Sequence, residues 1–161
     1  MRKIKMALTG LGLAVAAASL AAQASAPSAA HGVLNADALT WTDAPPSLPR
    51  GAQMAILSGD PSQPGPFTLR AKLPAGYAIA PHWHPTAEHL TILSGEASVG
   101  MGETVDVAAM QTMKAGSFAV MAPEMRHYLR TKTDTIVQVH GTGPFTVTYV
   151  NPADDPRQPT K

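Results

Sequence analysis

Three histidines and one glutamate in the sequence have the residue types and spacing of metal ligands. His82 and His84 lie two residues apart in a stretch expected to be extended, so their side chains leave the same face of one strand. Glu88 follows at the head of the next expected strand. His127 lies further along the chain, where a hairpin-like return is expected to bring it across. We therefore expect one metal site formed by these four side chains.

Three neutral imidazoles and one carboxylate form a mixed nitrogen and oxygen ligand set. Such a set suits a divalent transition metal, namely Fe, Mn, Ni, Cu or Zn, and contains too much nitrogen for Ca or Mg. Which of these metals binds is left open, because metal availability often decides it. Four protein ligands in an octahedral geometry would leave two positions for exogenous ligands, as a reactive site requires. A lone histidine is more often an ordinary hydrogen-bonded polar residue, but these residues form a set.

The elements that must position these residues are short apolar runs separated by turn residues rich in Gly and Pro. No segment between Gly51 and Val150 has convincing helical periodicity, and the spacing favours an all-β sandwich or barrel of about eight to ten strands. The segment from Glu103 to Lys114 is left open as a loop or a short helical turn. The expected strands are Ala52–Leu57, Phe67–Leu73, Tyr77–Ala80, His89–Leu93, Ala97–Gly100, Ser117–Met121, Thr135–His140 and Phe145–Val150.

The histidine-rich segment resembles the first motif of the cupin superfamily at every spacing. The matching pattern is Gly76-x5-His82-x-His84-x3-Glu88-x6-Gly95. The resemblance spans roughly Ala52 to Val150 and implies a double-stranded β-helix, the cupin jelly-roll barrel, with the metal in its mouth. Some segments also look like a group of single-domain exported bacterial cupins of unassigned activity, so the resemblance names no substrate.

The second cupin motif is recognisable but altered. Gly116 and His127 have the separation that the family shows, and the metal-binding histidine is retained. Pro123 lies one residue later than usual, Met125 stands where glycine is usual, and Thr131 stands where asparagine is common. We therefore regard the turn before His127 as less well defined than the ligand itself.

The N-terminal sequence is typical of a secretory signal peptide. Three basic residues precede an apolar run that ends in small residues. Cleavage is expected after Ala26, with Ala24 as the alternative, and would place the mature protein in the periplasm or outside the cell. A membrane anchor is disfavoured because the run is Ala- and Gly-rich and at the short limit for a span of about 20 residues. The expected divisions are 1–26 for the signal peptide, 27–50 for an Ala/Pro-rich tether, 51–150 for one cupin domain and 151–161 for a C-terminal arm.

Composition narrows the classes of function. Removal of three basic residues with the signal peptide leaves nine basic against eleven acidic residues, a formal charge of −2, so the sequence does not favour nucleic-acid binding. The absence of cysteine excludes disulfides, thiolate ligands and a thiol nucleophile. After cleavage we expect no membrane association.

No catalytic acid or base is fixed by spacing. Gln138 and His140 share one face of the Thr135–His140 run, and Val137 and Val139 share the other. If the polar face points inward, Gln138 and His140 are the first candidates to position substrate or relay a proton, although either face could be the inner one. His89 is expected to point away from the metal by strand parity and is left out of the ligand set.

Two classes of function fit this sequence. The first is a metal-dependent enzyme of oxygenase type acting on a small organic molecule, which is what the cupin resemblance implies. The second is a non-catalytic periplasmic module that binds or senses a metal or small ligand. Other cupin chemistries, including decarboxylation, isomerisation and lyase reactions, use the same ligands and stay open. The resemblance also implies a homodimer.

Overall fold

The structure is a computed structural model that describes residues 32–158 of the chain. The chain is treated as two units, residues 1–33 and residues 34–161. Only Gly32 and Val33 of the first unit are described, so the expected signal peptide and its cleavage site lie outside the described residues. The fold reported below is that of the second unit.

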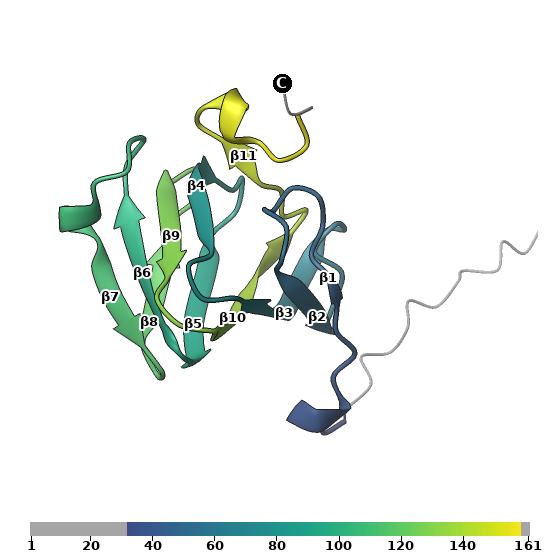
Figure 1. Ribbon diagram of the computed structural model, residues 1–161. Helices are drawn as coiled ribbons and strands as arrows, with labels where there is room; N and C mark the ends of the chain where they lie inside the picture. Colours follow the sequence, from purple (N-terminus) through teal and green to yellow (C-terminus); the bar gives the residue numbers. More distant parts are fainter. Residues whose placement is uncertain (1–31, 159–161) are drawn as a thin grey trace, which may run out of the picture. The chain divides into compact units, whose positions relative to one another are not determined.

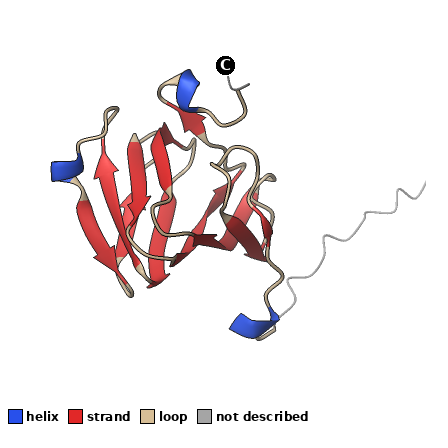
Figure 2. Ribbon diagram, viewed as in Figure 1, coloured by secondary structure: helices blue, strands red, loops and turns tan. Residues whose placement is uncertain are grey.

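Strands dominate the described residues, and the helical segments are three short 3-10 turns (Figure 2). Within residues 32–158, no helix has the length and apolar character needed to span a membrane. The strands are β1 (Thr42–Asp43), β2 (Gln53–Ser58), β3 (Gly65–Leu73), β4 (Ala78–Trp83), β5 (Glu88–Ser94), β6 (Glu96–Met101), β7 (Gln111–Lys114), β8 (Phe118–Met121), β9 (His127–Thr131), β10 (Thr135–Gly143) and β11 (Thr148–Tyr149). The 3-10 turns are η1 (Ala36–Ala38), η2 (Val107–Ala109) and η3 (Pro152–Asp154).

These strands form two antiparallel sheets (Figure 1). One sheet has the order β1-β2-β3-β10-β5-β8, and the other has the order β11-β4-β9-β6-β7. Buried and partly exposed residues alternate along β3, β5 and β10, because successive side chains in a strand point to opposite faces. The buried faces of both sheets contribute to one hydrophobic core, which includes Leu69, Ile92, Val99, Leu129 and Val139. The all-β, double-layered fold expected from the sequence is confirmed.

Some boundaries differ from the sequence-based expectation. Strand β9 was not among the expected apolar runs because His127, Arg130 and Thr131 make its sequence polar, although four of its five residues are buried. The open segment Glu103–Lys114 contains both η2 and β7. In the expected strand Phe145–Val150, only Thr148 and Tyr149 are in a strand.

The chain segments that precede and follow the main strands both have defined structure. In the expected tether, β1 pairs with β2, and the segment Pro45–Pro49 is held by two tyrosines. The Tyr77 hydroxyl donates to the Pro49 carbonyl at 2.6 Å, and the Tyr149 hydroxyl donates to the Ser47 carbonyl at 2.9 Å. After Tyr149, the chain continues through η3, where the Asn151 side chain accepts a hydrogen bond from the Ala153 amide.

Candidate metal centre

The four predicted ligands come from three strands and one connection. His82 lies near the end of β4, His84 lies just beyond that strand, Glu88 begins β5 and His127 begins β9. His82 and His127 are direct partners in the register between β4 and β9, and their ring centroids are 4.2 Å apart. All four side chains are buried, with exposed fractions of 8% or less. The structure therefore brings the complete predicted set together.

Hydrogen bonds to the backbone orient each imidazole. In His82, the Nδ1 atom lies 2.8 Å from the carbonyl oxygen of Ala80. In His84, it lies 2.7 Å from the carbonyl oxygen of Thr146, and in His127 it lies 2.9 Å from that of Met125. A carbonyl oxygen only accepts, so Nδ1 carries the proton and Nε2 has a free lone pair in the neutral ring. Metal-ligating histidines are fixed in this way by a partner on the other ring nitrogen.

The nitrogen and oxygen atoms that remain free converge on one point. One ligand nitrogen from each of His82, His84 and His127 lies within 4.8 Å of the others. The Glu88 Oε2 atom is 3.3 Å from His84 Nε2 and 3.1 Å from His127 Nε2. Two ligands at right angles, each about 2.1 Å from one ion, are separated by roughly 3 Å. The residues present therefore fit a divalent metal ion.

The local charges in the metal-free protein are set by burial and by the carboxylate. Burial favours the neutral form of Glu88, but hydrogen bonds and charge from His127 and His84 outweigh it and hold the pKa of Glu88 well below its usual range. Burial also opposes the charged form of His127, yet Glu88 raises the pKa of His127 above its ordinary value. Burial, together with the neighbouring His127 and His84, lowers the pKa of His82 to about 3.

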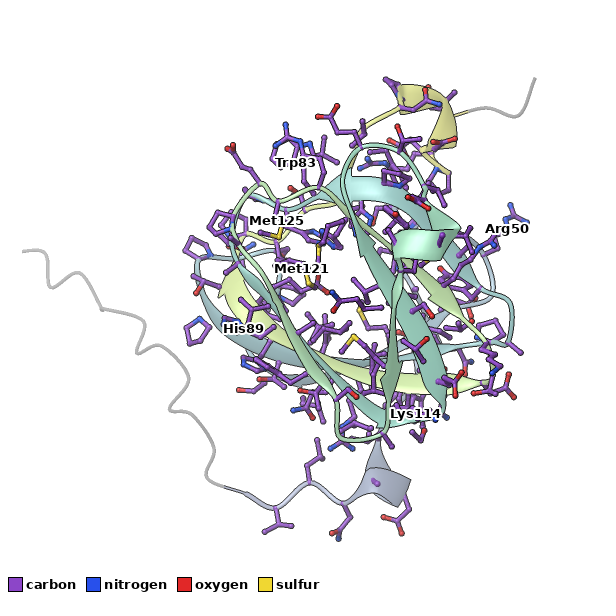
Figure 3. All side chains as sticks on the ribbon, turned by 90° about the vertical axis from the view of Figure 1, so that its left-hand side faces the viewer. Arg50, Trp83, His89, Lys114, Met121 and Met125 are labelled. Carbon is purple, nitrogen blue, oxygen red and sulfur yellow. The ribbon has the colours of Figure 1, made fainter. Side chains whose placement is uncertain are left out.

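A cavity of about 140 Å3 lies against this cluster. His82, His84 and Glu88 form part of its wall, while the rest is almost entirely apolar, with Leu69, Val137 and Val139 among the lining residues. A smaller cavity of about 30 Å3 is lined by His82, Glu88 and His127 together with Met121. Met121 is 1% exposed and its side chain lies inside the barrel (Figure 3). The candidate centre thus faces a space that a small molecule can enter.

The two catalytic candidates, Gln138 and His140, do not line this cavity. Val137 and Val139 face inward, so Gln138 and His140 lie on the outer face of β10. There Gln138 accepts a hydrogen bond from Arg70 at 3.1 Å, and His140 stacks on His89 with ring centroids 4.7 Å apart. Gln138 and His140 were candidates to position substrate only if the polar face of this strand pointed inward. Because that face points outward, this expectation is wrong.

His89 points away from the cluster, as strand parity indicated. His89 is paired with His140 of β10 in the strand register, and Phe118 of β8 lies beside both imidazole rings. Figure 3 shows His89 at the margin of the barrel, away from Met121.

Sequence reasoning missed several residues that shape the site. The Phe145 ring stacks on His84 at a centroid distance of 4.0 Å and an interplanar angle of 18°. Pro45, Ser47 and Leu48 line the cavity although they lie in the expected tether. Their sequence carries no alternation that indicates an inward face, because they contribute through a turn rather than through a strand. The one available signal was the concentration of proline after Trp41.

Comparison by sequence relates the chain to one protein family. A family described as "Domain of unknown function (DUF4437)" matches residues 17–148. This range covers most of the chain and contains all four predicted ligands. No curated protein sequence matches the chain.

Solved structures with the same fold include several cupins. A candidate acetylacetone dioxygenase from Methylibium petroleiphilum PM1 has a TM-score of 0.62 and 21% identity, covering 80% of this chain and 87% of its own. The polyketide cyclase RemF from Streptomyces resistomycificus has a TM-score of 0.63 and 12% identity, covering 78% and 89%. An RmlC-like cupin from Shewanella frigidimarina NCIMB 400 has a TM-score of 0.55 and 13% identity, covering 71% and 92%. These likenesses show the cupin jelly-roll fold that the sequence motifs implied.

Proposed function

This chain belongs to the DUF4437 family, which is cupin-like, and we propose that it is a metal-dependent enzyme of oxygenase type acting on a small organic molecule. One observation carries the proposal. Three imidazoles with backbone-fixed tautomers and one carboxylate converge at the wall of an internal cavity. A purely structural metal site is normally closed by its ligands, whereas a reactive site adjoins space for an exogenous ligand.

Each residue of the cluster has a definite part in this proposal. The Nε2 atoms of His82, His84 and His127 hold the ion, and the Glu88 carboxylate supplies the fourth ligand and offsets one positive charge. A bound Fe, Mn, Ni, Cu or Zn ion would supply Lewis-acid chemistry, and a redox-active one would also supply reactivity with O2. The apolar wall of the cavity excludes water from the reacting centre, which strengthens electrostatic interactions there.

The proposed reaction class rests on the set of metal ligands and on the structural relatives. The name of one structural relative describes a candidate dioxygenase, which supports oxygenase chemistry for this chain without fixing the substrate. The cavity contains no ionisable side chain other than the cluster itself among the described lining residues. We therefore propose that no side chain of the cavity wall outside the cluster takes part in proton transfer.

Metal analysis and oxygen uptake test this proposal together. The purified chain is expected to hold one metal ion per molecule and to consume O2 with at least one of a panel of phenols, thiols, diketones and small acids. The His82→Ala, His84→Ala double variant should lose both properties. The matched control is His89→Ala, which removes an imidazole on the outer face of β5 and should retain both. Stoichiometric tight metal in the double variant would show that the site is elsewhere, and tight metal and ligand binding without turnover would favour the sensor module.

Export belongs to the proposal as well. Processing after Ala26 would deliver the protein to the periplasm or the medium. Intact mass and the N-terminal sequence of the protein recovered from each fraction test this. A protein that begins at Met1 in the cytoplasmic fraction alone would contradict export.

A further inference from the structure

The cavity beside the metal cluster has two chemically different ends. At one end lie His82, His84 and Glu88, and the rest of the wall is formed by residues of β2, β3, β4, β5, β9 and β10 and of the loops that contain Pro45–Leu48, Pro61 and Phe145–Val147. Its volume of about 140 Å3 is below the ~300–1000 Å3 that is usual for sites of drug-sized ligands. The space therefore suits a compact molecule with one polar end.

Charge and hydrogen-bonding capacity are nearly absent from the remainder of the wall. Apart from the metal cluster, Ser47 is the only polar residue among those that line the cavity, and none of them is Lys or Arg. On the outer face of the same strands, Arg70 of β3 and Gln138 of β10 bond to each other at 3.1 Å and do not line the cavity. A carboxylate or a hydroxyl that points away from the metal would thus be buried without a partner, which is unfavourable.

From these observations we infer that the substrate is a compact, uncharged molecule with an apolar body and one polar end. The polar end binds the metal that the proposed function places on the cluster, so the inference rests on that proposal. The apolar body lies against Leu69, Ala71 and Val139, where its transfer from water is favourable. Sugars and polycarboxylates are excluded by the same wall.

A set of ligands with one shared head group tests the inference. Acetylacetone has the diketone head and two methyl arms, 4,6-dioxoheptanoate carries a carboxylate at the end of one longer arm, where it cannot replace a ketone in the six-membered chelate, and dibenzoylmethane replaces both arms by phenyl rings. Calorimetric titration of the Zn(II)-loaded chain should show that acetylacetone binds at least about tenfold more tightly than either of the others. Equal or tighter binding of the carboxylate analogue would overturn the assignment of an uncharged substrate, and tight binding of dibenzoylmethane would overturn the size limit.

Two cavity variants locate the binding of the apolar body. Ala71→Leu adds volume inside the cavity, and Val139→Thr keeps the volume but adds a hydroxyl group. Each should weaken acetylacetone binding by about tenfold while leaving the metal content unchanged. The matched control is Thr68→Val, which changes the outer face of β3 and should leave acetylacetone binding as it is. If both folded cavity variants bind acetylacetone as tightly as the parent, the cavity is not the binding site.

A metal-free measurement separates this inference from the proposed function. The methyl resonances of Leu69 and Val139 in the metal-free chain are expected to shift on addition of 2-pentanone, which has an apolar body but no chelating pair. They should not shift with glycerol. If the chain binds no metal but shows these shifts, the enzyme proposal is refuted and binding of apolar molecules in the cavity is supported. If the chain binds metal but does not show these shifts, only the inferred substrate class is refuted.

Discussion

At the scale of single residues, the backbone decides which nitrogen of each histidine is available. The Nδ1 atoms of His82, His84 and His127 are each within hydrogen-bonding distance of a main-chain carbonyl, so the three Nε2 atoms are turned toward one another. In the metal-free protein, the buried Glu88 carboxylate lies within 3.3 Å of the Nε2 atoms of His84 and His127 and so gives these two ring nitrogens a polar partner. The cluster is therefore oriented before a metal binds, which lowers the cost of ordering the ligands on binding.

Metal affinity should depend on pH through His127. Its pKa is raised by Glu88, so above pH 6.5 the metal-free protein still carries a proton on His127 that the unperturbed side chain would lose. Because a ligating imidazole must give up that proton, affinity should increase by about tenfold per pH unit until the raised pKa is passed. Titrations in buffers with different ionisation enthalpies measure the proton released. Affinity that stays constant over this range would contradict the role of His127 as a ligand.

At the scale of strands and turns, the first motif predicted the site well because its spacing is local. Gly76, Gly95 and Gly116 all have positive φ values, as expected for glycines that end one strand and begin the next. The turn before His127 was harder to predict because Met125 stands in the place of the usual glycine. In the structure, the left-handed residue of this turn is Glu124, with φ of 61°, and its amide donates to the His84 carbonyl.

The inward face of β10 could not be predicted from alternation alone. Val137 and Val139 alternate with Gln138 and His140, and parity assigns them to opposite faces without identifying the inner one. Long-range pairing settles the choice, because Val137 and Val139 are paired with Ala71 and Leu69, which lie on the buried face of β3. The packing of Pro45–Pro49 on the barrel depends on contacts even more distant in sequence, such as the one between Tyr149 and Ser47.

Thr131 stabilises the connection between β3 and β4, which explains how threonine serves where asparagine is common. Its Oγ1 atom accepts from the Tyr77 amide at 2.9 Å and donates to the Pro74 carbonyl at 2.6 Å, and the side chain is buried. Thr131→Val should lower the free energy of unfolding by about 0.5–1.5 kcal/mol, because it removes the hydrogen bonds of the hydroxyl while the Tyr77 amide keeps its bond to the Pro74 carbonyl at 3.1 Å. Thr131→Ser keeps the hydroxyl and should lose much less. Urea unfolding measures both, and a loss in Thr131→Ser that equals or exceeds the loss in Thr131→Val would show that the hydroxyl is not the main contribution.

At the scale of the whole barrel, the metal cluster joins the two sheets. Glu88 belongs to the sheet that contains β5, whereas His82 and His127 belong to the sheet that contains β4 and β9. An ion held by all of them would link the sheets at one end of the barrel, the end where Figure 3 shows Trp83 and Met125, opposite Lys114. Because the unfolded chain does not present these ligands together, metal binding is coupled to folding.

Metal removal should therefore destabilise the whole domain rather than only the residues near the site. Free metal at about a thousandfold above its dissociation constant is expected to raise the free energy of unfolding by about 4 kcal/mol. Thermal unfolding should move to higher temperature with added metal and return on chelation, and near-ultraviolet circular dichroism should report the same single transition. The His127→Ala variant, which removes a ligand from β9, should show little of this shift, while His89→Ala should show all of it. A full metal-dependent shift in His127→Ala would mean that the ion is bound without β9 and that the link between the sheets does not pass through this histidine.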